Sequence, residues 1–365
     1  MIETPDYWIV NKKFIFKPDF NKSLKKYLSL ISRCNKLIFS NYRNPYDAIN
    51  GRNESYHKEN NNITGSCFNI EVCKLPQNLT HLVFGFWFNQ PVSSLPPNLT
   101  HLVFGNNFDH QITGLPKSLT HLTFGYYFDQ QITGLPESLT HLTFGYYFDQ
   151  PVSNILPQSL THLIFGQSFN HQITGLPESL THLTLSHQFD QPVSGILPQS
   201  LTHLTFGDNF DHQISGLPES LIHLELGYHF NHQISGLPKS LIHLTLSDNF
   251  DQPVDGLPNI KILSIYCNNS HLIDNLPNSL EILLLRENFN LELNNLPNEL
   301  KKIIIDYPSL YDKELNNLPE SVELIQLPYQ YDKKISKLPK NLQIIRCNEE
   351  YKFIDDFVNY KVQTY

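Results

Sequence analysis

The sequence lacks the features that usually mark metal proteins and membrane proteins. Its five cysteines form no CxxC pair of metal-binding type; they are Cys34, Cys67, Cys73, Cys267 and Cys347. An odd and scattered set predicts free thiols in a reducing compartment, and therefore an intracellular, cytoplasmic location, which would be the host cytoplasm for a viral protein. No apolar run approaches the roughly 18 residues of a membrane span, and the N-terminus does not have the pattern of a signal peptide.

Catalytic motifs are also missing. There is no GxSxG, no HExxH and no phosphate-binding glycine loop, so the sequence predicts a protein that is not an enzyme and that uses no cofactor and no metal. The net charge of -9, with 17 neutral histidines, argues against nucleic acid as the partner, because phosphate binding needs a basic surface. We therefore expect a protein partner, still to be identified, with no nucleic acid and no membrane.

One segment repeats along most of the chain. LPKSLTHLTFGYYFDQ begins at Leu115, and LPESLTHLTFGYYFDQ begins at Leu135. Looser versions, each opened by Leu-Pro, recur about every 20 residues from Leu75 to Leu338. A fixed period of this size predicts a repeat solenoid, in which a single coil cannot bury its apolar face alone.

The pattern within a repeat predicts one short strand per coil. In LTHLTF, Leu122 and Phe124 alternate with His121 and Thr123, so two side chains face the core and two face solvent. Phe128 then returns to the core. Since about 20 residues leave no room for a long helix, the back of each coil should be extended or 3₁₀. Stacked coils would form one parallel β-sheet on one face of the solenoid, with that face open for binding.

The repeats divide the chain into four expected parts. Residues 1–74 are an N-terminal cap with one helix and a degenerate first coil, which carries an insertion near residues 43–65. Residues 75–256 are regular repeats, residues 257–348 are divergent repeats, and residues 349–365 are a C-terminal tail or cap. The helix is expected to cover the first coil because Leu24, Tyr27, Leu28 and Ile31 fall on one helical stripe.

The motif LPxSLTHLTFGxxFxQPV, with FNQPV from Phe88 and FDQPV from Phe148 and Phe189, resembles the FNIP repeat, a relative of the leucine-rich repeat. The resemblance covers residues 75 to about 256 strongly and extends weakly to about 348. It implies a leucine-rich-repeat-like solenoid and a role in protein interaction. The family occurs mainly in social amoebae and in giant viruses of amoebae. Many members also carry an F-box, which implies a ubiquitin-ligase subunit as partner, but residues 1–34 show one helix rather than three.

Three sets of equivalent residues recur from coil to coil. The first is a histidine ladder on the open strand face. It comprises His81, His101, His121, His141, His162, His182, His203, His223 and His243. It is interpreted as a solvated row of stacked rings, as a binding surface, or as a metal strip; a line of equivalent imidazoles does not close a tetrahedral site. Mutual repulsion of charged rings should lower their pKa values, and the fold should weaken below about pH 6.

The second set follows the core phenylalanine. Its members are Asn89, Asp109, Asp129, Asp149, Asn170, Asp190, Asp211, Asn231 and Asp251. Such side chains usually satisfy turn backbone groups. Calcium binding is the alternative, although one carboxylate per coil is few for such a site.

The third set precedes that phenylalanine and varies most. It runs Phe86-Trp87, Asn106-Asn107, Tyr126-Tyr127, Tyr146-Tyr147, Gln167-Ser168, His187-Gln188, Asp208-Asn209, Tyr228-His229 and Asp248-Asn249. Side chains that vary within a constant frame are typical of positions that determine binding specificity. They are also typical of surface positions that drift. Aromatic side chains are enriched at interface hot spots. The predicted partner-binding residues are Phe86, Trp87, Tyr126, Tyr127, Tyr146, Tyr147 and Tyr228, with His121 and His141 on the strand face.

Three functions remain open from the sequence. The first is a protein-protein interaction scaffold that binds through the strand face and the variable residues. The second is a substrate-recognition adaptor of a ubiquitin ligase with a degenerate F-box-like N-terminus. The third is a structural spacer without a specific ligand. Lys117 and Lys239 are the only basic residues within 75–256, so the regular repeats are acidic and favour a partner with basic patches.

Overall fold

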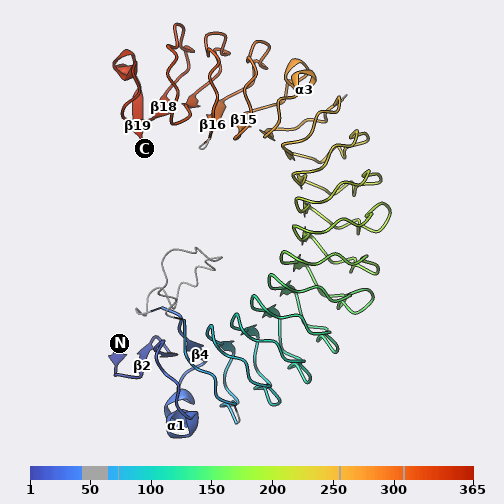
Figure 1. The fold of residues 1–365 in the computed structure, drawn as a ribbon, viewed down its shortest axis with the longest axis vertical. Coiled ribbons are helices and arrows are strands. Elements are labelled where there is room, and N and C mark those ends of the chain that lie inside the picture. Colours follow the sequence, from blue (N-terminus) through green and yellow to red (C-terminus); the bar gives the residue numbers. More distant parts are fainter. Residues whose placement is uncertain (43–64, 73, 255, 307–308) are drawn as a thin grey trace. The chain divides into compact units, whose positions relative to one another are not determined.

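The computed structural model describes residues 1–42, 65–72, 74–254, 256–306 and 309–365. The predicted insertion near 43–65 falls almost wholly outside these residues, and Cys73 lies outside them. The chain divides into two compact units, residues 1–180 and 181–365, which are described separately. In each unit, successive coils contribute one short strand and an extended back (Figure 1).

The first unit opens with an antiparallel segment and continues as a parallel sheet. Strand β1 pairs with β2, β2 pairs with β3, and from β3 onward each strand pairs in parallel with the next as far as β9. The strands are β1 (Ile2–Glu3), β2 (Tyr7–Val10), β3 (Lys13–Phe16), β4 (Lys36–Phe39), β5 (His81–Val83), β6 (His101–Val103), β7 (His121–Thr123), β8 (His141–Thr143) and β9 (His162–Ile164).

The second unit is parallel throughout. Each strand from β10 to β18 pairs in parallel with the strand that follows it. The strands are β10 (His182–Thr184), β11 (His203–Thr205), β12 (His223–Glu225), β13 (His243–Leu246), β14 (Ile262–Ile265), β15 (Ile282–Leu285), β16 (Lys302–Ile305), β17 (Leu324–Gln326), β18 (Ile344–Cys347) and β19 (Lys361–Thr364). Its helical segments are α3 (Ser270–Asp274) and the 3₁₀ segment η2 (Ile354–Phe357).

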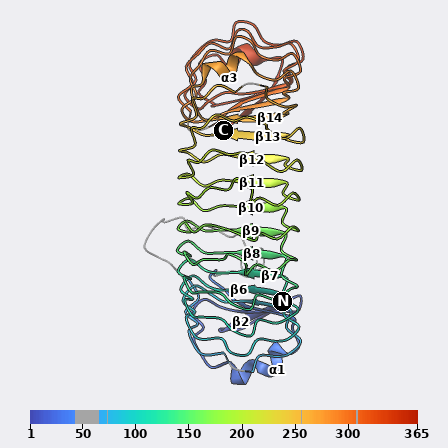
Figure 2. The ribbon, with the colours of Figure 1, turned by 90° about the vertical axis from the view of Figure 1, so that its right-hand side faces the viewer.

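The predicted leucine-rich-repeat-like solenoid is confirmed, and the coil around β7 shows why it forms. The proline of the Leu-Pro pair has no N–H to donate, and its carbonyl oxygen accepts from the Leu119 amide at 3.1 Å. Strand β7 follows with Leu122 and Phe124 buried. In the sheet, His101, His121 and His141 are partners in register, so equivalent residues of β6, β7 and β8 lie directly above one another (Figure 2).

The core contains a column of phenylalanines, one from each regular coil. Phe108, Phe128 and Phe148 have no exposed surface, and successive ring centroids are 6.1 Å apart. Burying one such ring contributes about 1.5–3 kcal/mol. In the second unit Phe289 stacks on Tyr311 at 6.0 Å, and Tyr331 and Tyr351 continue the column. The divergent repeats therefore keep the aromatic column, with tyrosine in place of phenylalanine, which the sequence pattern did not predict.

The predicted N-terminal helix is present but short. It consists of the 3₁₀ segment η1 (Leu24–Tyr27) and one turn of α-helix, α1 (Leu28–Ile31). Leu24, Tyr27 and Ile31 of the predicted stripe are buried, and the Ser23 hydroxyl accepts from the Lys25 amide at 3.5 Å. The hairpin of β2 and β3 was not predicted. It supplies the strand that pairs with β4, because Phe14 and Phe16 bury fully against the first coil.

Candidate functional site

The variable residues form a row at the corner that follows each strand, here called the corner row. In this row the backbone is bonded from coil to coil. The Tyr127 amide donates to the carbonyl of Asn106 at 2.8 Å, and the Tyr147 amide donates to the carbonyl of Tyr126 at 3.0 Å. The same bond recurs in the second unit, from the His229 amide to the carbonyl of Asp208 at 2.8 Å. The row is thus a fixed frame whose side chains vary.

A glycine precedes the corner row because neighbouring coils approach closely there. A β-carbon added at Gly125 would lie 2.0 Å from the carbonyl oxygen of Gly105, far inside van der Waals contact. The close approach turns the chain out of the strand and presents the next two side chains at the edge of the sheet.

Four tyrosines of the corner row form a cluster, here called the tyrosine patch: Tyr126, Tyr127, Tyr146 and Tyr147. Tyr126 stacks on Tyr146 with ring centroids 4.6 Å apart, and Tyr127 stacks on Tyr147 at 5.5 Å. Tyr127, Tyr146 and Tyr147 remain 48%, 38% and 45% exposed. Burial, together with the neighbouring phenols of Tyr147 and Tyr146, raises the pKa of Tyr126, so its phenol is neutral at physiological pH.

The other predicted corner residues lie outside this cluster. Phe86 and Trp87 sit two coils before Tyr126 and Tyr127 and meet edge-on at 4.9 Å, with Trp87 45% exposed. The coil between the one with Phe86 and Trp87 and the one with Tyr126 and Tyr127 carries Asn106 and Asn107. Tyr228 belongs to the second unit, where its ring lies edge-on to His229 at 4.9 Å.

The histidine ladder is a stack of nearly parallel rings. In the first unit the centroids of His81 and His101, and those of His121 and His141, are 4.1 Å apart. The interplanar angles of these pairs are 7° and 10°. Each of these rings places Nδ1 2.9 Å from the hydroxyl of the preceding threonine; the pairs are Thr80–His81, Thr100–His101, Thr120–His121 and Thr140–His141. His121 and His141, predicted as binding residues, are therefore held by their own coils.

The pKa values of five ladder histidines are lowered, as predicted, but burial and not mutual repulsion is the first cause; they are His81, His101, His121, His203 and His243. The pKa of His81 is lowered to about 4, first by burial and then by the charges of His101 and Lys36. Burial is also the first cause of the lowered pKa values of His101 and His121. In the second unit, burial lowers the pKa of His243 to about 4.

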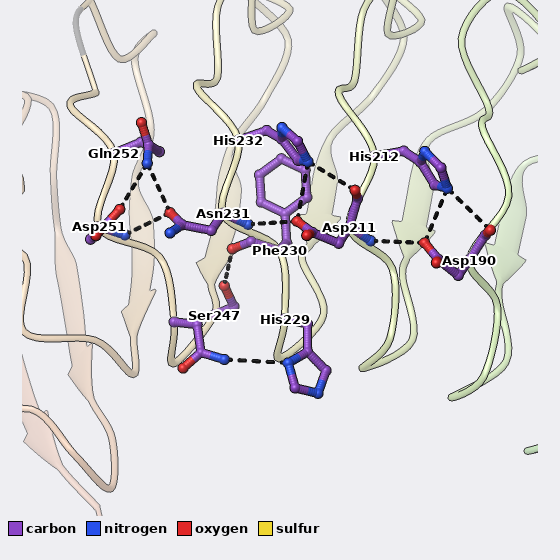
Figure 3. A network of polar contacts seen from close by, with 11 residues as sticks. Asp190, Asp211, His212, His229, Phe230, Asn231, His232, Ser247, Asp251 and Gln252 are labelled. Atoms are coloured by element: carbon purple, nitrogen blue, oxygen red, sulfur yellow. Dashed lines mark hydrogen bonds and ion pairs between the residues drawn. The ribbon is translucent and has the colours of Figure 1, made fainter.

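The Asp/Asn residues satisfy backbone groups, as predicted, and they do so across coils. The Asp149 amide donates to a carboxylate oxygen of Asp129 at 2.9 Å, and the Asp211 amide donates to Asp190 at 3.2 Å. Figure 3 shows the same chain of contacts in the second unit, where His212 also reaches Asp190 at 3.1 Å. In the part of the chain that the structure describes, no three His, Cys, Asp or Glu side chains converge as a metal site.

The second unit carries a polar run on its strand face that the sequence reading missed. Arg286 pairs with Asp306, and the Gln326 amide donates to Asp306 at 3.4 Å. Arg346 donates to the side-chain oxygens of Gln326 at 3.5 Å and of Gln363 at 2.9 Å. The spacing of about 20 residues between these polar positions was the available signal, but the divergent repeats obscured it.

These features place the chain among known repeat proteins. The FNIP Repeat family model matches residues 88–127, 112–147, 128–168, 169–209, 189–229 and 210–247. Residues 88–247 of the chain are FNIP repeats. No curated protein is significantly similar to its sequence.

Two solved structures are similar to this chain, and one of them is described as a leucine-rich-repeat protein. CroV588, described as a novel circular leucine-rich-repeat structure, is 28% identical with a TM-score of 0.53; the similarity covers 95% of this chain and 68% of CroV588. YopM from Yersinia enterocolitica WA-314 is 22% identical with a TM-score of 0.47, over 77% of this chain and 66% of YopM. Solenoids of this class typically serve as scaffolds for protein-protein interaction and not as enzymes.

Proposed function

We infer that this FNIP-repeat protein is a non-enzymatic scaffold that binds a protein partner through the tyrosine patch and the adjoining strand face of the first unit. The observation that carries the proposal is the patch itself: four tyrosine rings pack against one another, and three of them stay more than a third exposed. Contiguous exposed aromatic surface of this kind is typical of binding sites, whereas isolated exposed aromatic residues are not.

The frame supports the patch as a recognition surface. The patch backbone is tied to its neighbours by the amide of Tyr147 and the carbonyl of Tyr126, and each ring rests on another ring. Little conformational entropy is left to lose on binding, so most of the contact energy of a docked side chain would appear as affinity. Tyrosine adds a hydroxyl that can bond to the partner at the edge of an apolar contact.

The charge of the regular repeats and the free thiols support a protein partner in an intracellular compartment. The regular repeats carry two lysines and no arginine, which disfavours nucleic acid as partner. Among the described residues, no helix is long and apolar enough to cross a membrane. Cys34, Cys67, Cys267 and Cys347 are free thiols, and burial raises the pKa of Cys34, Cys267 and Cys347. Free thiols fit a reducing, intracellular compartment.

The ubiquitin-ligase adaptor and the structural spacer stay predictions. Described residues 1–42 hold strands and the single helical segment of residues 24–31, so no observation there favours a ubiquitin-ligase adaptor. The exposed aromatic patch weighs against a spacer without a ligand, because such a surface carries an aggregation risk when nothing covers it.

The test compares two exposed-tyrosine variants. The partner is captured with tagged full-length protein, identified by mass spectrometry, purified, and titrated against wild type, the Y127A/Y147A double variant and the Y228A control. Tyr228 is 44% exposed, about as much as Tyr127 and Tyr147, but it lies outside the patch. We expect Y127A/Y147A to raise the Kd by about 30-fold, the effect of losing one hot spot, and Y228A to leave it unchanged. Equal affinity for all three proteins would contradict the proposal.

A further inference from the structure

From His81 to His203, the threonine before each ladder histidine determines which ring nitrogen carries the proton. The hydroxyl of Thr100 lies 3.0 Å from the carbonyl oxygen of Thr80 and 2.9 Å from Nδ1 of His101. The hydroxyl of Thr120 has the same two neighbours, the carbonyl of Thr100 and Nδ1 of His121. A hydroxyl has one hydrogen to donate and lone pairs to accept with.

Donation to the carbonyl is the arrangement that satisfies both contacts. Two oxygens 3.0 Å apart repel unless a proton lies between them, so the Thr100 hydroxyl donates to Thr80. Its oxygen then accepts from His101, which requires a hydrogen on Nδ1. Neutral imidazole carries one N–H, and Nε2 is therefore left as an acceptor.

The stack gives these acceptors a common direction. His101 and His121 are 4.2 Å apart with planes inclined by 9°, and their Nδ1 atoms make the same threonine contact. Their Nε2 lone pairs therefore point in nearly parallel directions on the half-buried strand face. Parallel lone pairs do not converge on one ion, which argues against a bridging metal and for separate hydrogen-bond donors, one per coil.

The surroundings of His101 and His121 favour cationic hydrogen-bond donors. Residues Val103 and Thr123, which share the strand face with these rings, carry no charge. Lys13 and Lys36 occupy the ladder position of β3 and β4, next to His81, and His141 and His162 follow His121 on the other side. The two lysines disfavour a cation at the β4 end, so the usable stretch begins beyond His81, with the rings of His101 and His121.

We propose that the Nε2 atoms of His101 and His121 accept hydrogen bonds from lysine or arginine side chains of the protein partner, and that protonation of these rings releases it. The inference rests on the proposed function and names the chemistry of the partner segment at the same surface. A proton on Nε2 removes the acceptor and adds a positive charge that faces the partner's cation. At neutral pH both rings are uncharged, because burial lowers their pKa values.

The tautomer is tested on the protein alone. Selective ¹⁵N labelling of histidine and NMR near neutral pH should show the hydrogen of His101 and His121 on Nδ1. The T100V/T120V variant removes both hydroxyls and should shift these signals, whereas the T143V control, on the same face but outside a Thr–His pair, should not. A hydrogen found on Nε2 in wild type would overturn the inference and leave the tyrosine patch proposal untouched.

The ligand class is tested with defined peptides on the full-length protein. Fluorescence anisotropy compares an alternating arginine–glycine peptide with a glutamate–glycine peptide, near pH 7.5 and near pH 5, with circular dichroism as the check of folding. We expect the arginine peptide to bind, and H101R/H121R to weaken it about tenfold, the loss of roughly one charge-assisted hydrogen bond. H101Q/H121Q retains an acceptor oxygen and should keep the binding while losing its pH dependence.

The outcomes separate the two proposals. Arginine-peptide binding that H101R/H121R leaves unchanged, or binding of the glutamate peptide instead, would overturn the inference. Binding that falls with Y127A/Y147A but ignores pH and the histidine variants would support the patch and overturn the role of the ladder. Binding that responds to both sets of variants would support both.

Discussion

Two stretches of the histidine ladder in the second unit differ in the residue before the histidine and behave differently. Where threonine precedes the histidine, His182 and His203 stack at 4.2 Å with planes inclined by 9°. Where Ile222 and Ile242 replace the threonine, the spacing from His203 to His223 grows to 5.7 Å, and His223 meets His243 at 88°. One hydroxyl per coil therefore holds a ring in the stack.

The change also alters what the strand face offers. Without its threonine, His223 turns toward Glu225, with Nε2 and a carboxylate oxygen 3.9 Å apart. The contact with His223 is the first cause of the lowered pKa of Glu225. Nε2 of His243 is buried, and the described residues offer it no hydrogen-bond partner. The threonine coils present a regular row, and the isoleucine coils present an irregular, charged one.

The largest effect on stability is expected from a substitution in the column of buried phenylalanines. Phe210→Ala removes a fully buried ring that stacks on Phe189 and Phe230. We expect a loss of about 3–5 kcal/mol in the free energy of unfolding, measured by urea denaturation, and disruption of the ladder on both sides of the coil. A loss below about 1 kcal/mol would mean that the column does not hold the coils together.

Acid should weaken the fold through the ladder. The unfolded histidine titrates near 6.5, and the folded pKa of His81 is about 4. Between these values the unfolded chain binds more protons, so stability is present above about pH 6.5 and falls as pH drops toward about 4. We expect a loss of on the order of 1–2 kcal/mol for the ladder after solvent screening. The urea midpoint should be lower near pH 5.5 than near pH 7.5, and H81Q should reduce the difference; equal midpoints would refute this.

Exchange of the threonine and the isoleucine should move the boundary of the stack. Thr202→Ile removes the contact with His203 at 2.9 Å and the bond to the Thr181 carbonyl at 3.0 Å, at a cost of about 1 kcal/mol. Ile222→Thr should extend the stack to His223. Histidine NMR shifts report both changes. Unchanged shifts of His203 in the first variant would show that the hydroxyl does not align the ring.

The smallest effect is expected in the divergent part of the column. Tyr331 donates its hydroxyl to the Lys313 carbonyl at 2.9 Å, a bond that phenylalanine cannot make. Tyr331→Phe keeps the stack and should lower the free energy of unfolding by about 0.5–1.5 kcal/mol. A variant more stable than wild type would show that the hydrogen bond does not offset the free-energy cost of burying the hydroxyl.

Much of the fold could be predicted because the same local pattern recurs. The alternation in LTHLTF identified the strand and its buried face, and the position of Asp129 identified its role in the turn. The N-terminal hairpin was missed because β2 and β3 lie outside the repeat. Of the candidate site, the corner row was predicted as a row, but the ring contacts that join Tyr126, Tyr127, Tyr146 and Tyr147 into one cluster were not; the binding role of Tyr228 stays a prediction.

The sequence by itself determined the coil, its strand and the inward face, because a period of two within a period of about 20 allows one way to bury the apolar side chains. It did not determine which side chains on the open face meet. The four tyrosines form one cluster, and Thr120 orients His121, only when stacked coils bring residues about 20 positions apart within a few ångströms. Register and ring orientation are properties of that stacking, and tertiary structure alone decides them.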